Sequence, residues 1–199
     1  AYLFNVYMDE SDFRTTGDAG YDWGYGDLAT VKTEGVDTWT DKYFEQAQDN
    51  GFEVLFLAPL LQLVGGVGNS NAKDVTNWDE PDIEAFEVLE QIIMRTYELG
   101  GRVHIWDGGD NDHKLTWNSA PTGWMGTQHK RYIRYLAARL GALPGWTLAP
   151  GYDLEEWLTD TKAGDWADEL HKYLGWEHMV CARRITNSSL DFLSYSYLG

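Results

Sequence analysis

The sequence predicts an α/β fold of the TIM-barrel type, a (β/α)8 architecture of which about six strand–helix units are present. Two observations predict it. Short apolar segments alternate with segments of helical periodicity along the chain. Glycine-centred turns follow the predicted helices, whereas long polar loops follow the predicted strands. This order requires parallel strands with helical crossovers, and it places functional side chains at the carboxyl ends of the strands.

Six apolar segments are the predicted strands, and they lie within a single partial-barrel domain that spans residues 1–199. They are residues 2–8, 54–58, 103–106, 146–149, 179–182 and 192–195. A closed barrel has eight strands and typically about 250 residues. We therefore expect the missing strands to come from further sequence or from another chain. An open six-stranded sheet is the alternative.

Four segments have the apolar periodicity of helices, at residues 39–47, 83–97, 128–140 and 165–174. The second is expected to begin at Asp79-Glu-Pro-Asp82, which offers a capping residue, an early proline and acidic residues for the first turn. Thr127 and Asp165 are the expected capping residues of the third and fourth helices.

The composition limits the possible functions. A net charge of -17 argues against nucleic acid and anionic membranes as partners. No apolar run of about eighteen residues occurs, so no membrane span is predicted. The chain opens on Ala1 without a signal-peptide pattern, which indicates a mature or excised piece. Ten Trp and twelve Tyr suit a protein that stacks aromatic rings on sugars, and with a carbohydrate substrate we expect an extracellular or cell-surface location.

The most informative stretch is residues 145–157, in which a short apolar strand leads into three carboxylates. These are Asp153, Glu155 and Glu156, and they lie between Tyr152 and Trp157. Glycoside cleavage needs one protonated and one ionised carboxyl group, and aromatic walls raise the pKa of a carboxyl group that they bury. The alternative is a solvated helix start, because acidic residues favour the first turn of a helix.

The third predicted strand ends in a second group of candidate residues. His104 and Trp106 alternate along it, so both should face the same side, with Trp106 as a stacking platform for sugars. Asp107 and Asp110 follow in the loop and could hold sugar hydroxyls. The alternative is a buried, hydrogen-bonded histidine above a polar turn. A calcium site that adds Asp112 is disfavoured, because the spacing lacks the twelve-residue loop and terminal Glu of an EF-hand.

The sequence lacks the motifs that would indicate other enzymatic chemistries. No His-Glu-x-x-His pattern or Cys/His cluster indicates zinc, and no Gly-x-Ser-x-Gly elbow indicates a serine hydrolase. The glycines from Gly65 to Gly68 lead into Asn-Ser-Asn rather than a helix, so no dinucleotide cofactor is expected. Arg183, at the end of the fifth strand, could bind a substrate carboxylate such as that of a uronate. A structural ion pair is the alternative role for Arg183.

Five stretches resemble the catalytic barrels of glycoside-hydrolase-like bacterial and archaeal proteins in the clan with two catalytic carboxylates. They are Arg102-Val-His-Ile-Trp-Asp-Gly-Gly-Asp110, Gly123-Trp-Met-Gly126, Tyr135-Leu-Ala-Ala-Arg-Leu-Gly141, Pro144-Gly-Trp-Thr147 and Gly151-Tyr-Asp-Leu-Glu-Glu-Trp157. The resemblance implies that the acid/base residue closes strand four, at Asp153 or Glu156. Tyr152-Asp153 stands in place of the usual Asn-Glu pair. The nucleophile would close strand seven, which would lie beyond Gly199.

The function expected from the residues and the resemblance together is hydrolysis of glycosidic bonds in a poly- or oligosaccharide by paired carboxylates, without a cofactor or metal. Asp153 and Glu156 are the candidate catalytic residues. The candidate substrate-binding residues are His104, Trp106, Asp107, Asp110, Trp124, Tyr152, Trp157, Arg183 and Tyr195. Two alternatives remain: a non-catalytic carbohydrate-binding or structural protein on a barrel scaffold, and a metal-dependent hydrolase that uses the Asp107 loop.

Overall fold

The computed structural model describes residues 3–5, 35–57, 64, 77–107, 117–151 and 154–194. Tyr152, Asp153, Asp110 and Tyr195 lie outside the described residues, as do residues 2, 6–8 and 58 of the predicted strands. The six strands are β1 (Leu3–Asn5), β2 (Val54–Leu57), β3 (Arg102–Trp106), β4 (Trp146–Ala149), β5 (Cys181–Arg183) and β6 (Phe192–Ser194).

All pairings among the six strands are parallel and follow chain order. β1 to β4 form one sheet, and β5 pairs with β6. A parallel bridge between Leu148 and Val180 joins the two sheets. The backbone N–H of Leu148 donates to the Met179 carbonyl at 3.3 Å beside this bridge. The predicted α/β fold with neighbouring parallel strands is therefore confirmed.

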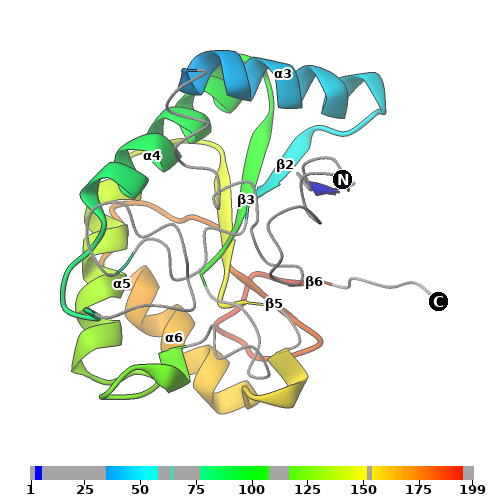
Figure 1. The fold of residues 1–199 in the computed structure, drawn as a ribbon. Coiled ribbons are helices and arrows are strands. Elements are labelled where there is room, and N and C mark those ends of the chain that lie inside the picture. The colour runs from blue at the N-terminus through cyan, green and yellow to red at the C-terminus, as the bar shows by residue number, and fades with distance from the viewer. Residues whose placement is uncertain are drawn as a thin grey trace, which may run out of the picture.

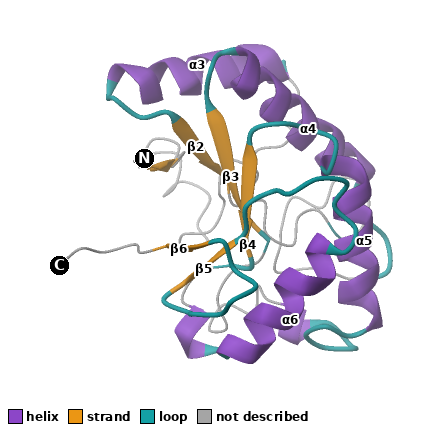
Figure 2. Cartoon of the chain, turned by 180° about the vertical axis from the view of Figure 1, so that it is seen from behind, coloured by secondary structure: helices purple, strands orange, loops and turns teal. Residues whose placement is uncertain are grey.

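Four helices cover one side of the strands. They are α3 (Val36–Asp49), α4 (Ile83–Glu98), α5 (Thr127–Leu140) and α6 (Asp160–His171). In Figure 1 they form an arc around the strands, and β1 and β6 lie on the side away from this arc. Figure 2 shows the same arrangement from behind. Parallel strands inside a curved layer of helices are the arrangement of a TIM barrel.

Three predicted helix starts are corrected. α4 is capped by Asp82, whose carboxylate accepts the Ala85 N–H at 3.1 Å, so the expected start at Asp79 was too early. α6 begins at Asp160 behind a Thr159 cap rather than at Asp165. Gly126, not Thr127, occupies the capping position of α5 and makes no side-chain cap bond.

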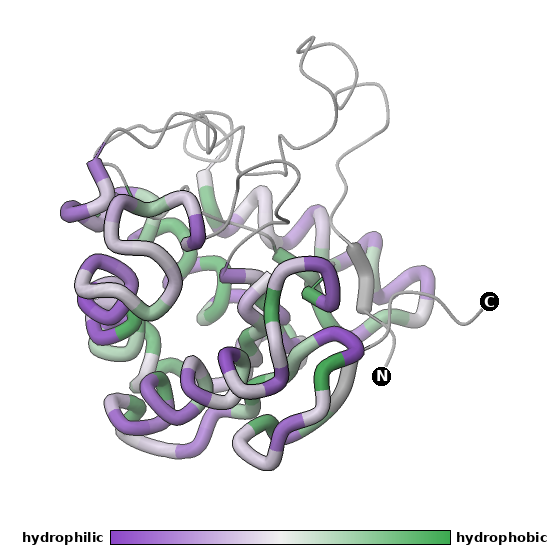
Figure 3. Tube along the Cα trace, turned by 90° about the horizontal axis from the view of Figure 1, so that it is seen from below, coloured by the Kyte–Doolittle hydropathy of each residue, from purple (hydrophilic) through white to green (hydrophobic). Residues whose placement is uncertain are grey.

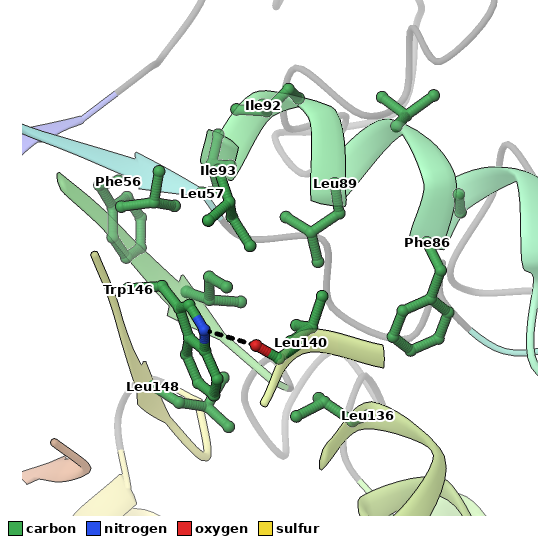
Figure 4. Close-up of a cluster of buried hydrophobic side chains, with 14 of the residues drawn as sticks. Phe56, Leu57, Phe86, Leu89, Ile92, Ile93, Leu136, Leu140, Trp146 and Leu148 are labelled. Atoms are coloured by element: carbon green, nitrogen blue, oxygen red, sulfur yellow. Dashed lines mark hydrogen bonds between the residues drawn. The ribbon is translucent and has the colours of Figure 1, made fainter. Parts of the chain in front are cut away.

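The main core lies between the strands and the helices. Successive strand residues point to opposite faces, so Leu57, Ile105 and Leu148, which are in register, all face the helices. All three are buried, and they pack in one cluster with Leu89 and other α4 and α5 residues (Figure 4). Along the helices, hydrophilic and hydrophobic residues alternate, as expected for elements with one buried and one solvated face (Figure 3).

The connection between the last two described strands differs from the helical connections that precede it. The connection from β5 to β6, residues 184–191, contains no helix. A smaller cluster packs here around Leu154, Trp157 and Ala182. Within the described residues, no helix is both long and apolar enough to cross a membrane.

Candidate active site at the carboxyl ends of the strands

The face of the sheet opposite the helices carries polar and aromatic residues. His104 is in register with Phe56 on β2 and with Thr147 on β4. The ring of Phe56 contacts both His104, at a centroid distance of 5.8 Å, and Trp106, at 4.3 Å. The prediction that His104 and Trp106 face the same side is therefore confirmed. Trp106 is only half-buried, so it can offer part of its ring to a ligand.

His104 is a neutral, buried histidine. Its side chain is 2 % exposed, and burial lowers its pKa to about 4. Nδ1 lies 2.7 Å from the Thr147 hydroxyl, while Nε2 has no hydrogen-bond partner among the described residues. This is the buried, hydrogen-bonded histidine considered as the alternative to a sugar ligand. Nε2 nevertheless remains available for a hydrogen bond inside the barrel.

Asp107 lies on the other face from Trp106. Its backbone N–H donates to the Ala149 carbonyl at 2.8 Å, and its side chain is 1 % exposed. Its carboxylate faces His129 in the first turn of α5, with 3.7 Å between Oδ2 and Nε2. The side chain therefore packs toward α5, and its predicted contact with sugar hydroxyls would require it to turn away from His129.

The protonation of His129 is defined by its surroundings. Nδ1 accepts the Met125 N–H at 3.1 Å, so the neutral ring carries its proton on Nε2, toward Asp107. Burial lowers the pKa of His129, and the hydrogen-bonding and charge effects of Asp107 oppose that shift. The neutral imidazole thus points its Nε2 proton toward the buried carboxylate, 3.7 Å away.

Tryptophan rings enclose His129. Trp117 stacks on it at 4.5 Å with an interplanar angle of 6°, and Trp124 meets it edge-on at 4.6 Å. Trp124 also contacts Trp157 edge-on at 5.4 Å. Trp157 is buried and Trp124 half-buried. The structure thus brings together two predicted substrate-binding residues, Trp124 and Trp157, beside the carboxyl ends of β3 and β4.

The carboxylates after β4 occupy different environments. A short 3-10 helix, Leu154–Glu156, carries Glu155 and Glu156. The Glu155 carboxylate accepts Arg184 Nη1 at 3.0 Å and lies 3.9 Å from Arg183 Nη2. Glu156 is exposed. For Arg183 the geometry supports an ion-pair contact, as in the alternative considered above.

His129 and Trp117 were not identified as site residues from the sequence. A signal for Asp107 was nevertheless available, because strand alternation places it opposite Trp106 and therefore toward the following helix. Within the described part of the chain, no group of three or more His, Cys, Asp or Glu residues could hold a metal ion. Asp110 and Asp112, which the disfavoured calcium site would need, lie outside the described residues.

Comparison with known proteins identifies similar folds. No family model and no curated protein matches the sequence. Among solved structures, GH5_18 from Streptomyces cattleya in complex with GlcNAc is 16% identical, with a TM-score of 0.53 over 78% of this chain and 41% of that chain. GH5_18 from Bifidobacterium longum subsp. longum is 14% identical, with a TM-score of 0.51 over 82% and 41% of the two chains.

These similarities show the fold. The chain has an α/β fold like that of the TIM-barrel proteins of glycoside hydrolase family 5, as the sequence predicted. It spans about two-fifths of the length of these structures, 41% in both cases.

Proposed function

We propose that this barrel binds a poly- or oligosaccharide at the carboxyl ends of its strands and hydrolyses glycosidic bonds with paired carboxylates. The observation that carries the proposal is the Trp124–Trp157 contact beside the acidic turn that follows β4. Sugar cleavage uses paired carboxylates, and neighbouring aromatic rings offer apolar faces on which a sugar can stack. The fold supports the proposal, since one similar structure is described in complex with GlcNAc.

Asp153 is the first candidate for the general acid, and Glu156 is the second. A general acid gives its proton to the glycosidic oxygen as the bond to the sugar breaks, and a second, ionised carboxylate stabilises or attacks the sugar carbon. Glu156 is exposed, so a bound glycan would have to cover it before it could act as the acid.

The described aromatic and polar residues would bind the sugar. Trp106 and Trp124 are both half-buried and would offer ring faces. Tyr152, Asp110 and Tyr195 stay in this proposal as predicted binding residues outside the described part of the chain. The strands that complete a barrel would come from a further segment or a second chain. An extracellular or cell-surface location belongs to the same proposal.

A non-catalytic carbohydrate-binding protein is the second candidate function. Two observations favour it: Glu155 is held by Arg184, and β4 is followed directly by Pro150 and Gly151 rather than by a carboxylate. A barrel of this kind would keep the aromatic binding surface without the acid.

A glycan panel tests the proposal. The intact protein is assayed for both binding and release of reducing ends on manno-, cello- and chito-oligosaccharides. Turnover of at least one glycan is the expected result. Binding without turnover would replace the hydrolase by the binding protein, and the absence of both would reject carbohydrate as the ligand of this site.

A further inference from the structure

A pocket lies at the opposite ends of the strands from the candidate active site. It has a volume of about 390 Å³ and is lined by residues from the amino ends of β3 and β4 and from the segment before β5. The lining includes Arg102, Trp176, Glu177, His178 and Met179. Pockets of this size are typical of sites for small ligands. The proposed hydrolase function leaves this end of the barrel without a role.

Trp176 is exposed but fixed in orientation. Its side chain is 57% exposed, although its indole N–H donates to Nε2 of His178 at 2.7 Å. His178 is only 6% exposed and stacks on Trp146 with a centroid distance of 4.0 Å and an interplanar angle of 18°. The buried histidine therefore holds the exposed indole in one plane, so a ligand that stacks on it would meet a pre-organised surface.

Two charged side chains at this pocket can still bind a ligand. Among the described residues, Glu177 makes no hydrogen bond or ion pair, and it is exposed. Nη1 of Arg102 donates to the Gly101 carbonyl at 2.6 Å, and the guanidinium lies over the Tyr97 ring at 5.0 Å. Nη1 also donates to the Gly100 carbonyl at 3.4 Å, whereas the N–H groups of Nε and Nη2 have no acceptor among the described residues. One donor group and one acceptor group thus flank the indole.

We propose that this pocket is a second carbohydrate-binding site, which takes a neutral oligosaccharide with its apolar face on Trp176 and its hydroxyl groups on Arg102 and Glu177. A sugar has both the apolar face that an indole ring can stack on and the hydroxyl groups that both donate and accept hydrogen bonds. An apolar occupant would instead cover Arg102 and Glu177 without hydrogen bonds, at the cost of desolvating two charges.

The binding experiment uses cello-, manno- and chito-oligosaccharides as probes. Binding is measured by calorimetry, and the Trp176 indole N–H signal is followed by NMR after assignment with Trp176→Phe. We expect Trp176→Ala to weaken the affinity of the responding probe at least about tenfold, which is about 1.4 kcal/mol. Glu177→Gln should weaken it less. Ile83→Ala, which removes an exposed apolar side chain on α4, is the control and should leave binding unchanged.

The outcomes separate this proposal from the proposed function. If no probe shifts the Trp176 indole signal, or if Trp176→Ala binds every probe as the wild type does, the second site is overturned, whatever the turnover assay shows. If Trp176-dependent binding persists while no glycan is hydrolysed, the second site stands and the hydrolase fails. Trp176→Phe keeps a ring but loses the bond to His178, so an affinity between those of the wild type and Trp176→Ala supports a stacking platform.

Discussion

Two buried histidines, one at each end of the strands, are built alike and behave differently. Each stacks on a tryptophan: His129 on Trp117 at the carboxyl ends and His178 on Trp146 at the amino ends. Burial is the main cause that lowers the pKa of both. Their polar partners differ. His129 faces a buried carboxylate, whereas Nε2 of His178 contacts both the Trp176 N–H, at 2.7 Å, and the Gly141 carbonyl, at 3.0 Å.

Because of this difference, we expect His129 to have a structural role and His178 to change its hydrogen-bond partner with pH. His129 has one compatible arrangement, because Nδ1 accepts from Met125 and the Nε2 proton points at Asp107. A single nitrogen of His178 cannot both accept from the Trp176 N–H and donate to the Gly141 carbonyl. An unprotonated Nε2 of His178 therefore holds Trp176, whereas a proton on Nε2 favours the Gly141 carbonyl.

The largest expected effect on stability comes from removing His129, which faces Asp107 at the carboxyl ends of the strands. His129→Ala removes the ring between Trp117 and Trp124 and leaves the Asp107 carboxylate buried without its partner. Because removal of a fully buried side chain leaves a cavity in the core, we expect a loss of about 2–5 kcal/mol in the free energy of unfolding. Trp176→Ala, at the exposed ring, should cost less than about 0.5 kcal/mol. Urea unfolding measures both, and equal losses would refute the distinction.

A third buried histidine makes stability depend on pH. Burial lowers the pKa of His104 to about 4, below its unfolded value of about 6.5. The unfolded chain therefore binds the proton first as the pH falls. Its contribution to stability is complete above pH 6.5 and is lost between about pH 6.5 and 4, by roughly 3 kcal/mol. His104→Asn, which keeps a polar group toward Thr147, should flatten this part of the profile measured by urea unfolding at several pH values. An unchanged slope would contradict the assignment to His104.

The sequence was sufficient for the strands and for their order. Residues 146–149 were predicted as a strand and form β4. The start of α6 was missed because its first turns bury only Ala163 and Gly164, which are too small to produce an apolar period. The pocket at the amino ends could not be predicted, since it depends on how Trp176 and Arg102 meet across two strands.

The candidate active site was predicted in part. The sequence placed Trp124 and Trp157 in the site, and the structure brings them into contact. It could not show that Asp107 contacts His129, because that contact depends on the packing of α5 against β3. The ion contacts of Glu155 with Arg183 and Arg184 likewise depend on tertiary structure.

A smaller loss of stability is expected when the hydrogen bond between His104 and Thr147 is removed. Thr147→Val keeps the shape of the side chain but removes the hydroxyl that lies 2.7 Å from Nδ1. The ring nitrogen then loses its only described partner, and we expect a loss of about 1–2 kcal/mol in the free energy of unfolding. Thr40→Val, which removes a hydroxyl bonded to a carbonyl of its own helix at 2.7 Å, is the matched control and should cost less. The reverse order of the two losses would contradict a specific role for Thr147.

Protonation of His178 should release Trp176. The charged groups near it are Arg102 and Glu177 in the pocket and His171, whose Nε2 lies 3.4 Å from the His178 carbonyl and 3.7 Å from Asp191. Because the pKa of His178 is lowered, the indole bond should persist at neutral pH and be lost only well below pH 6.5. The NMR signal of the Trp176 N–H reports this directly. A signal that does not move at any pH at which the protein stays folded would contradict the two-partner arrangement.

The most direct test of the proposed hydrolase is the rate of glycan cleavage by Asp153→Asn, compared with Glu155→Gln. Removal of a general acid lowers the rate by about 10²–10⁴-fold without changing the fold. Glu155 is bound by Arg184 at 3.0 Å, so its neutralisation should leave the rate within a small factor of the wild type. We expect Asp153→Asn to lose turnover and to keep the wild-type melting temperature. Full activity in Asp153→Asn, and in Glu156→Gln as well, would contradict it.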